Sequence, residues 1–261
     1  MKRGFYFSVP ELWDICLDKL YDKSRYLNGL EALFQKHGIN KSSKILDAAC
    51  GTGFPAINLH ERGYEVRASD RNRDMLEQFE RNAKSRDISL ESSCLEPKCA
   101  DWGTLHWSYY ADSLDLVLCR GNSLVYVNSW GWSWIARGWS GPNSMLEALK
   151  DFHTILKPGG MLYVDVTSAK ESPHKMSWEL NTKMGPAEVR WVISHPEEKV
   201  RNWYLEVELK KGGPLERISF YSYFPPPGEI ASLLKTAGFS RIESGAHVDG
   251  EGTYDVHLAW K

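Results

Sequence analysis

Apolar residues recur at spacings of three and four over residues 5–37, and this period predicts two amphipathic helices ahead of the first strand. Gly38 follows the second of them, as glycine commonly does at the C-terminal end of a helix. We therefore expect residues 1–40 to form a helical N-terminal cap.

From residue 44 onward, short apolar runs alternate with amphipathic stretches. The runs predict strands at 44–49, 65–69, somewhere in 89–100, at 114–119 and at 161–167. The stretches between them predict helices at 54–62 and 73–86, and a third helix that is capped by Asn143 or Ser144 and runs to 155. Residues 156–160 read as a turn, and Pro97 makes the strand in 89–100 hard to place. Such alternation predicts a parallel sheet with helices on both faces.

After Ser168 the pattern changes to strict alternation of apolar and polar residues, which is the period of half-buried strands. Three such segments, 187–193, 200–210 and 215–224, predict a two- or three-stranded antiparallel insertion. A helix at 228–237 and strands at 239–244 and 254–260 complete the chain. The expected division is a core over 41–168, an insertion over 169–224 that covers the substrate, and a C-terminal part of the core over 225–261.

The stretch Ile45–Gly53 combines a buried strand with a Gly-x-Gly turn, and a helical segment follows it. Gly51 and Gly53 allow backbone angles closed to other residues and let the main chain approach a ligand. Asp47 precedes this turn, and Asp70 ends the next strand about twenty residues later, where an acid can accept both ribose hydroxyls of an adenosine. The pattern indicates a nucleotide-binding α/β unit.

At these residues the sequence resembles the class I S-adenosylmethionine (SAM)-dependent methyltransferases. Ala100-Asp101-Trp102 resembles the loop in which that family holds adenine, and Leu156–Gly160 resembles its turn before the fifth strand. The matches cover most of 40–170. The resemblance implies an α/β fold with a Rossmann-like, seven-stranded, mostly parallel sheet and a closing antiparallel hairpin, and it implies SAM as the cofactor.

Within that family, Cys119–Ser123 resembles the end of the fourth strand in glycine and sarcosine N-methyltransferases. Phe220–Phe224 and the lead-in residues Trp13 and Arg25 are similar as well. The chain departs from that group after Asp165, where Thr167 stands in place of an Arg that clamps the substrate carboxylate. A desolvated carboxylate needs a cation or several N–H donors, for which Arg120 or Arg190 are the candidates.

The resemblance implies the following site residues. Cofactor binding falls to Asp47, Ala49, Gly51, Gly53, Asp70, Arg71, Ala100, Asp101, Trp102, Cys119, Arg120, Trp13 and Arg25. Substrate binding falls to Asn122, Trp132, Trp134 and Tyr223, and Asn122 and Tyr221 would position the reacting groups.

Composition narrows the class of protein. A net charge of −2 without a block of like charge argues against a dedicated nucleic-acid binder. Five irregularly spaced cysteines favour neither disulfides nor zinc, and we expect reduced thiols, a cytoplasmic location and no metal. No apolar run is long enough for a membrane span. Several of the 11 tryptophans fall in the loop 129–144, which reads as a lid over the acceptor or as a packing or oligomer contact.

We therefore expect an enzyme that transfers a methyl group from SAM to a small molecule, with an amine nitrogen as the first candidate acceptor, either as a monomer or as a homo-oligomer. An O- or C-methyltransferase of a small natural product is the nearest alternative. A SAM-binding partner protein without catalysis belongs to another class. A dinucleotide dehydrogenase fits poorly, because Ala56 stands where the third glycine of its motif belongs.

Overall fold

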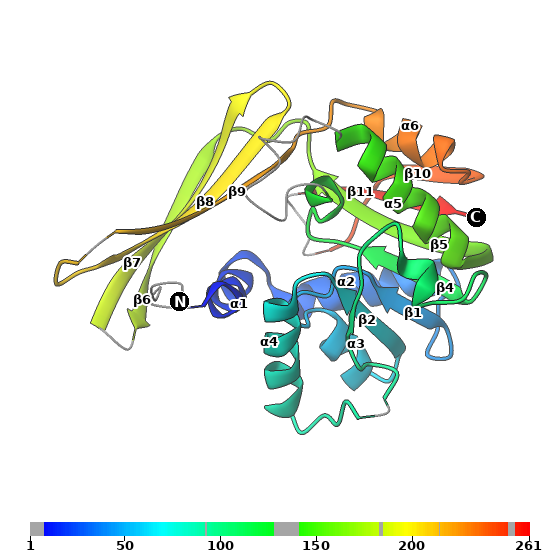
Figure 1. Cartoon of the computed structure of the whole chain (residues 1–261), viewed down its shortest axis with the longest axis horizontal. Coiled ribbons are helices and arrows are strands. Elements are labelled where there is room, and N and C mark those ends of the chain that lie inside the picture. The colour runs from blue at the N-terminus through cyan, green and yellow to red at the C-terminus, as the bar shows by residue number, and fades with distance from the viewer. Residues whose placement is uncertain (1–7, 92, 128–140, 183–184, 214, 250–253) are drawn as a thin grey trace.

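The computed structural model describes residues 8–91, 93–127, 141–182, 185–213, 215–249 and 254–261 (Figure 1). The helices are α1 (Val9–Leu20), α2 (Lys23–Lys36), α3 (Ala56–Glu61), α4 (Arg73–Lys84), α5 (Gly141–Ile155) and α6 (Glu229–Thr236), with short 3₁₀ turns η1 (Leu105–Trp107) and η2 (Leu124–Tyr126). The strands are β1 (Lys44–Asp47), β2 (Glu65–Asp70), β3 (Lys98–Cys99), β4 (Leu114–Cys119), β5 (Leu156–Thr167), β6 (His174–Thr182), β7 (Gly185–Glu197), β8 (Val200–Leu209), β9 (Glu216–Tyr223), β10 (Arg241–Ala246) and β11 (Tyr254–Trp260).

Seven strands form one sheet in the order β10-β11-β5-β4-β1-β2-β3. β1 pairs in parallel with β2 and β4, β4 pairs in parallel with β5, and β11 closes the sheet antiparallel to β5 and β10. The expected mostly parallel sheet with a closing hairpin is confirmed. The strand order reverses between β1 and β4, and ligands of such sheets bind at the carboxyl ends of the strands at this point.

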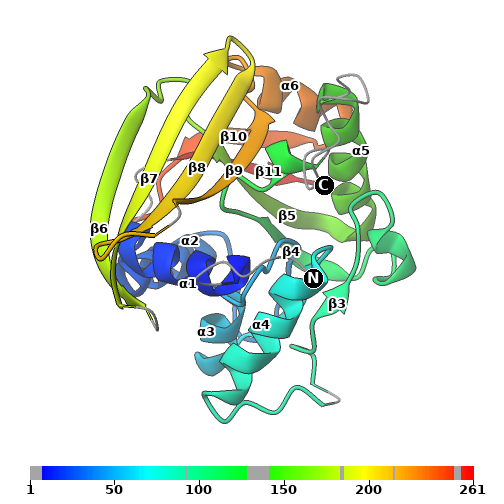
Figure 2. The ribbon, with the colours of Figure 1, turned by 60° about the vertical axis from the view of Figure 1, so that its left-hand side comes forward.

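Apolar side chains fill both faces of this sheet. One core cluster contains Leu149 and Phe152 of α5 and Leu234 of α6, and the other contains residues of α2, α3 and α4 such as Phe34 and Phe79. Helix α1 contributes to both clusters, and it lies between the larger sheet and the second sheet (Figure 2). The N-terminal cap is therefore part of the core packing.

The insertion is a four-stranded antiparallel sheet in the order β6-β7-β8-β9. The expectation of two or three strands was wrong because β6 is an edge strand whose residues are mostly exposed, so its sequence lacks a clear apolar face. One face of β7 and β8 carries the large apolar residues that join the first core cluster, including Trp191 and Trp203.

Several element boundaries differ from the expectation, among them those of β3, β5 and α5. β3 has only two residues, because Pro97 directly before it has no N–H to extend the pairing. The expected turn at 156–160 belongs to β5, since Leu156 already pairs with Leu114 before the register shifts. Helix α5 begins at Gly141, ahead of both expected cap residues.

Gly29 of α2 offers a test of the packing between the cap and the C-terminal part of the core. A Cβ at this position would lie 2.5 Å from the carbonyl oxygen of Asp249 and 2.6 Å from its nitrogen. Gly29→Ala should therefore lower the free energy of unfolding by about 1–3 kcal/mol, although alanine normally stabilises a helix interior. Denaturant unfolding measures this. Ser24→Ala on the exposed side of α2 is the control, and equal stabilities for the two variants would contradict the packing.

Candidate cofactor and acceptor site

The glycine turn after β1 is held against the end of β2. Gly51 has a φ of +51° and Gly53 a φ of +114°, and a Cβ on Gly53 would lie 2.3 Å from Cδ1 of Ile57. The backbone N–H of Cys50 donates to the carbonyl of Ser69 at 3.0 Å. Glycine is therefore needed at position 53 both for its backbone conformation and for the close packing of α3.

Asp70 orders this turn. Its Oδ2 accepts the N–H of Gly51 at 3.0 Å, and its Oδ1 accepts the N–H of Asn72 at 2.8 Å. Burial raises the pKa of Asp70, and the two backbone N–H groups counteract that shift. A carboxylate has lone pairs beyond these two bonds, so Asp70 can hold the turn and still accept a hydroxyl.

A crevice opens beside Asp70 at the carboxyl ends of β1 and β2. Its lining residues are Ala48, Ala49, Asp70, Arg71, Ala100, Asp101, Trp102, Ser123 and Val127. The indole N–H of Trp102 donates to the carbonyl of Ala48 at 2.8 Å, which fixes the ring as a wall of the crevice. Small residues on one side, an aromatic wall and two carboxylates form a set that suits an adenosine.

Six of the predicted cofactor residues line this crevice, and others lie close to it. Trp13 of α1 reaches the turn, because its Nε1 is 3.9 Å from the Cβ position of Gly51. Asp14 and Thr52 both accept from the Asn82 side-chain amide at 2.9 Å, and these bonds hold α1 over the turn. Sequence reasoning missed this link, which joins residues far apart in the chain.

Two predicted cofactor residues lie elsewhere. Arg25 is at the surface and its Nε donates to Oδ1 of Asp249 at 2.8 Å. The Cys119 side chain is fully buried in the core, and burial raises the pKa of its thiol. Neither side chain belongs to the crevice lining.

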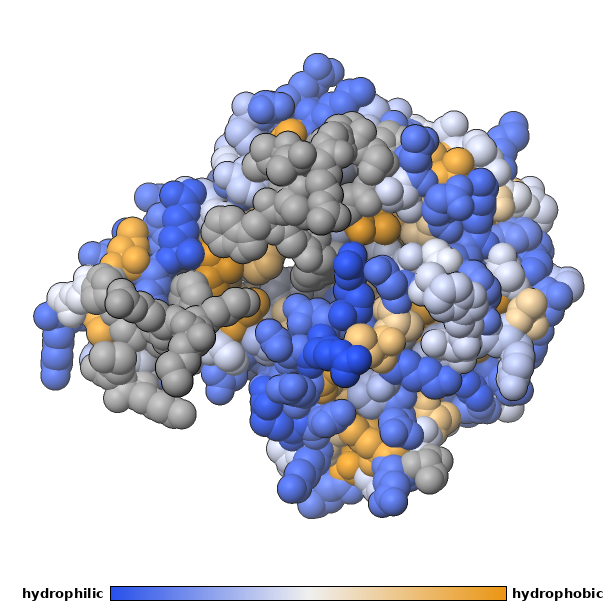
Figure 3. All heavy atoms as spheres, in the orientation of Figure 1, coloured by the Kyte–Doolittle hydropathy of each residue, from blue (hydrophilic) through white to orange (hydrophobic). Residues whose placement is uncertain are grey.

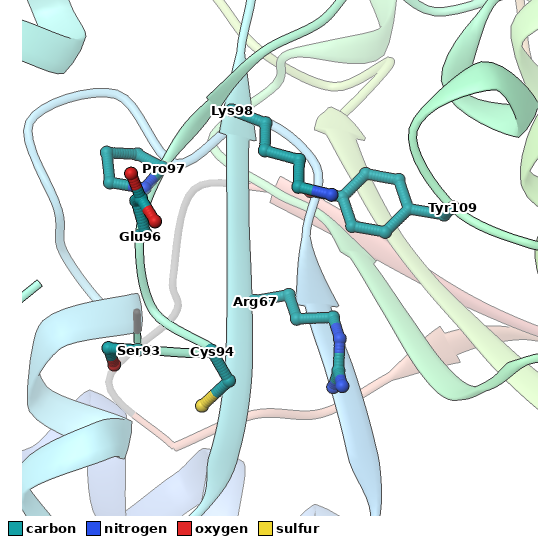
Figure 4. A pocket seen from close by; sticks show the side chains of 7 residues that line it. All are labelled: Arg67, Ser93, Cys94, Glu96, Pro97, Lys98 and Tyr109. Carbon is teal, nitrogen blue, oxygen red and sulfur yellow. The ribbon is translucent and has the colours of Figure 1, made fainter. Parts of the chain in front are cut away.

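A second cavity, of about 360 Å³, lies at the edge of β2 where β3 is short (Figure 4). Arg67, Lys98 and Tyr109 are among its lining residues. Its cations already have partners, since Arg67 pairs with Glu65 at 2.8 Å and Lys98 donates to the Ser108 carbonyl at 3.0 Å. It shares no lining residue with the crevice at the glycine turn.

Buried charges lie behind the crevice at the ends of β1, β4 and β5. Asp47 and Asp165 are fully buried, and each has one carboxylate oxygen, Oδ2, without a hydrogen-bond partner among the described residues. Burial raises the pKa of Asp47 to about 7 and also raises the pKa of Asp165, while Arg120 opposes both shifts. When both acids are ionised, this group carries a net negative charge that favours a cationic ligand.

Arg120 is committed to an aromatic cluster. Its Nε donates to the Tyr26 hydroxyl at 3.1 Å and its Nη1 to the Phe54 carbonyl at 2.8 Å. Its guanidinium carbon lies 5.1–5.5 Å from the ring centroids of Tyr21, Tyr26 and Phe54. The geometry makes Arg120 a buried structural cation beside the two acids.

Asn122 joins the ends of β4 and β5. It has a φ of +60°, its N–H donates to Asp165 Oδ1 at 2.6 Å, and its Oδ1 accepts the N–H of Thr167 at 2.7 Å. Its side-chain amide nitrogen is buried and has no hydrogen-bond partner in the described part of the chain. That nitrogen can therefore donate a hydrogen bond to a ligand at the carboxyl ends of β4 and β5.

The insertion supplies an aromatic wall that the sequence analysis did not identify. Trp203 stacks on Trp191 at 4.7 Å and 9° and on Phe220 at 4.4 Å and 19°, and it contacts Trp13 at 5.9 Å. Figure 3 shows a hollow near the middle of one face of the molecule, with hydrophobic residues on the side of the four-stranded sheet. Apolar residues at every second position of β7 and β8 were the available signal.

Tyr221 and Tyr223 lie on the opposite face of β9 from Phe220, because side chains alternate along a strand. Tyr223 is buried in the core cluster that also contains Ile230 and Leu234 of α6. Trp132 and Trp134 lie outside the described residues. Of the predicted substrate residues, the structure brings Asn122 to the strand ends.

Comparison with known proteins identifies the domain. Residues 45–160 match the methyltransferase domain family. The glycine/sarcosine N-methyltransferase of Parasynechococcus marenigrum is 32% identical over 133 residues, which are 51% of this chain and 40% of that protein. The glycine N-methyltransferase of Mus musculus is 30% identical over 161 residues, 60% of this chain and 50% of its own length. The chain thus spans about half the length or less of these relatives.

A solved structure is similar over the full chain. CalS10 from Micromonospora echinaspora, described as an amino pentose methyltransferase with SAM bound, has a TM-score of 0.67 and 15% identity, and the match covers 100% of this chain and 99% of that one. Residues 45–160 therefore match a methyltransferase domain, and all the residues that line the crevice at the glycine turn lie within the matched range. The resemblance to the glycine/sarcosine group is confirmed for about half of the chain.

No helix in the described part of the chain is both long and apolar enough to cross a bilayer. No group of three or more His, Cys, Asp or Glu side chains among the described residues is arranged to hold a metal ion.

Asp70→Ala tests the cofactor crevice. The variant loses the bond to Gly51 and the acceptor for the ribose, so SAM affinity should fall about tenfold or more, at least 1.4 kcal/mol. Calorimetry with SAM measures it, and Asp74→Ala at the exposed start of α4 is the control. Unchanged affinity for the Asp70 variant would remove the ribose assignment.

Asp47 should make SAM binding depend on pH. Its pKa near 7 means that the carboxylate becomes ionised between pH 6 and 8, and the ionised form favours a cation. Affinity for SAM should therefore rise with pH by up to about tenfold over this range. Calorimetry on Asp47→Asn provides the reference, because that variant retains only the titration of the ligand and of other groups. Parallel pH profiles for both proteins would contradict the role of Asp47.

Proposed function

We propose that the protein transfers the methyl group of SAM to an amine nitrogen of a small molecule that carries no carboxylate at the acceptor end. The observation that carries this proposal is the position of two buried acids and an aromatic wall beside the cofactor crevice. Asp47 and Asp165 supply negative charge at the strand ends, and Trp203 with Trp13 supplies ring surface. Aromatic faces and buried carboxylates both favour amines and their methylated, cationic products.

Glycine as an acceptor would require a cation that is free to bind its carboxylate. Thr167 is buried and its N–H is bound to Asn122. Arg120 is bonded to Tyr26 and Phe54, while Arg190 pairs with Glu206 and Glu208. Both arginines considered as carboxylate clamps are thus engaged, which favours an acceptor without an acid group.

The names of the similar proteins agree with an amine acceptor. The half-length relatives are named for glycine and sarcosine N-methylation, and CalS10 is described as acting on an amino pentose. We propose an amino compound of the second kind, because the similarity to CalS10 extends through the insertion that supplies the aromatic wall.

The acceptor nitrogen would attack as the neutral amine, so that the N–C bond forms while the C–S bond breaks, and the proton that the nitrogen loses would pass to solvent or to Asp47, whose pKa is about 7. Bound SAM supplies a methyl group on a sulfonium, which is already a good leaving group. Asn122 and Asp165 would fix the strand ends against which the acceptor nitrogen rests, and Trp13 and Trp203 would exclude water. Orientation of this kind contributes about 7–11 kcal/mol in favourable cases.

Methylation of a hydroxyl would instead require a general base close to the methyl group. His106 bonds to Asp151 at 2.8 Å, and His257 bonds to Ser244 at 2.8 Å. No histidine belongs to the described crevice lining. A base for a hydroxyl acceptor would therefore have to come from the carboxylates of Asp47 or Asp165, and the choice between amine and hydroxyl rests on the aromatic wall and on the acceptor panel below.

The decisive experiment measures release of S-adenosylhomocysteine from SAM with a panel of amines, amino acids and phenols. We expect turnover with amines that lack a carboxylate and none with simple phenols. Turnover with phenols alone would contradict the proposal. SAM binding without product from any acceptor would favour a non-catalytic SAM-binding protein.

Trp203→Phe tests the aromatic wall. The smaller ring retains the stack on Trp191 but withdraws surface from Trp13, so the KM for the acceptor should rise several-fold, about 1 kcal/mol. The SAM affinity should change much less, through the contact of Trp203 with Trp13 alone. Steady-state kinetics measures both, and Trp107→Phe, at an indole that is 80% exposed, is the control. Equal weakening of acceptor and SAM would place Trp203 outside the acceptor site.

A further inference from the structure

A buried ion pair joins the four-stranded sheet to the segment that follows β5. Arg201 of β8 donates from Nε to Oε2 of Glu171 at 2.7 Å and from Nη2 to Oε1 at 3.0 Å. The two side chains are only 4% and 5% exposed. Glu171 lies in the connection between β5 and β6, so this bidentate pair ties the root of the insertion to the end of the core strand.

The same pair reaches the 3₁₀ turn after β4. Nη1 of Arg201 donates to the Tyr126 hydroxyl at 3.4 Å. Tyr126 follows Asn122 by four residues, and Glu171 follows Thr167 by four. Asn122 and Thr167 are themselves joined by a hydrogen bond. The contacts of Arg201 with Tyr126 and Glu171 thus lie close along the chain to both partners of that bond.

On the side of the insertion, the pair is continuous with the aromatic wall. Arg201 and Trp203 are two residues apart on β8, so they leave the sheet on the same face. His195 of β7 places Nε2 3.2 Å from Oε2 of Glu171. Burial lowers the pKa of His195, which keeps the ring neutral near pH 7. Arg201 is therefore the cation that pairs with Glu171.

Stability alone does not explain such a pair. Removing two charges from water costs several kcal/mol, and buried ion pairs often contribute no more than apolar residues of similar volume. A bidentate pair, by contrast, fixes both distance and orientation. At this position, distance and orientation determine how the aromatic wall faces the ends of β4 and β5.

We propose that Arg201 and Glu171 are positioning residues for the acceptor, holding the aromatic face of the insertion in register with Asn122 and leaving SAM binding unaffected. This inference rests on the proposed function. The pair does not line the cofactor crevice, whose lining comes from β1, β2 and the loops after β3 and β4. Loss of the pair should therefore weaken binding of the acceptor and leave binding of SAM unchanged.

The test compares Arg201→Met, Arg201→Lys, Glu171→Leu and the double variant Arg201→Met/Glu171→Leu. Both neutral single variants should raise the KM for the acceptor about tenfold, with kcat lowered less and SAM affinity unchanged. Arg201→Lys should fall between wild type and Arg201→Met, because lysine retains the charge but not the bidentate geometry. Lys210→Met, which breaks an exposed pair with Glu179 on the same sheet, is the matched control.

The double variant separates positioning from stability. Its melting temperature should recover relative to the single variants, since no buried charge is left unpaired, while the KM for the acceptor stays raised. A KM that returns to the wild-type value would overturn the inference, because packing alone would then position the wall. SAM and acceptor affinities that fall equally would overturn it as well.

Amide hydrogen exchange tests the inference without an acceptor. In Arg201→Met with SAM present, residues 124–126 and 200–204 should exchange about tenfold faster than in wild type, and Lys210→Met should show no change. If wild type methylates no amine, the proposed function fails and the role toward the acceptor fails with it, while exchange still shows whether the pair holds residues 124–126 and 200–204 in place. Equal exchange in wild type and Arg201→Met would reject that role whatever the acceptor.

Discussion

The carboxylate of Asp70 holds the site together, because both of its oxygens accept backbone N–H groups from the segments that surround the cofactor crevice. One bond fixes Gly51 in the turn after β1, and the other fixes Asn72 at the start of α4. The bond to Gly51 joins the turn after β1 to the carboxyl end of β2. The Trp102 wall is anchored to the carbonyl of Ala48 in the same turn.

The acceptor side is built differently. Asn122 bridges β4 and β5, and the ion pair of Arg201 and Glu171 connects that bridge to the insertion. Polar bonds therefore set the geometry of a wall whose surface is aromatic.

The sequence was sufficient for features that depend on neighbouring residues. The glycine turn, Asp70 and the alternation of β1–β5 with helices are local patterns, and the structure contains them. The aromatic stack and the ion pair were not predicted, because Trp191 and Trp203, or Glu171 and Arg201, meet only when strands are placed side by side. β6 was missed for a similar reason, since an exposed edge strand has no apolar face to reveal it. The partners of Arg120 were not predicted either, because Tyr21, Tyr26 and Phe54 are far from it in the sequence.

Helix α1 should influence the affinity for the methyl donor. Trp13 lies between the glycine turn and Trp203, and Asn82 bonds α1 to the turn through Asp14. The N-terminal helix thus forms part of the surroundings of a ligand in the crevice. Docking of the helix and binding of the ligand are therefore thermodynamically linked. Any change that loosens the first helix would lower the apparent affinity for the methyl donor without altering one residue of the crevice, and saturating donor would protect this helix from proteolysis.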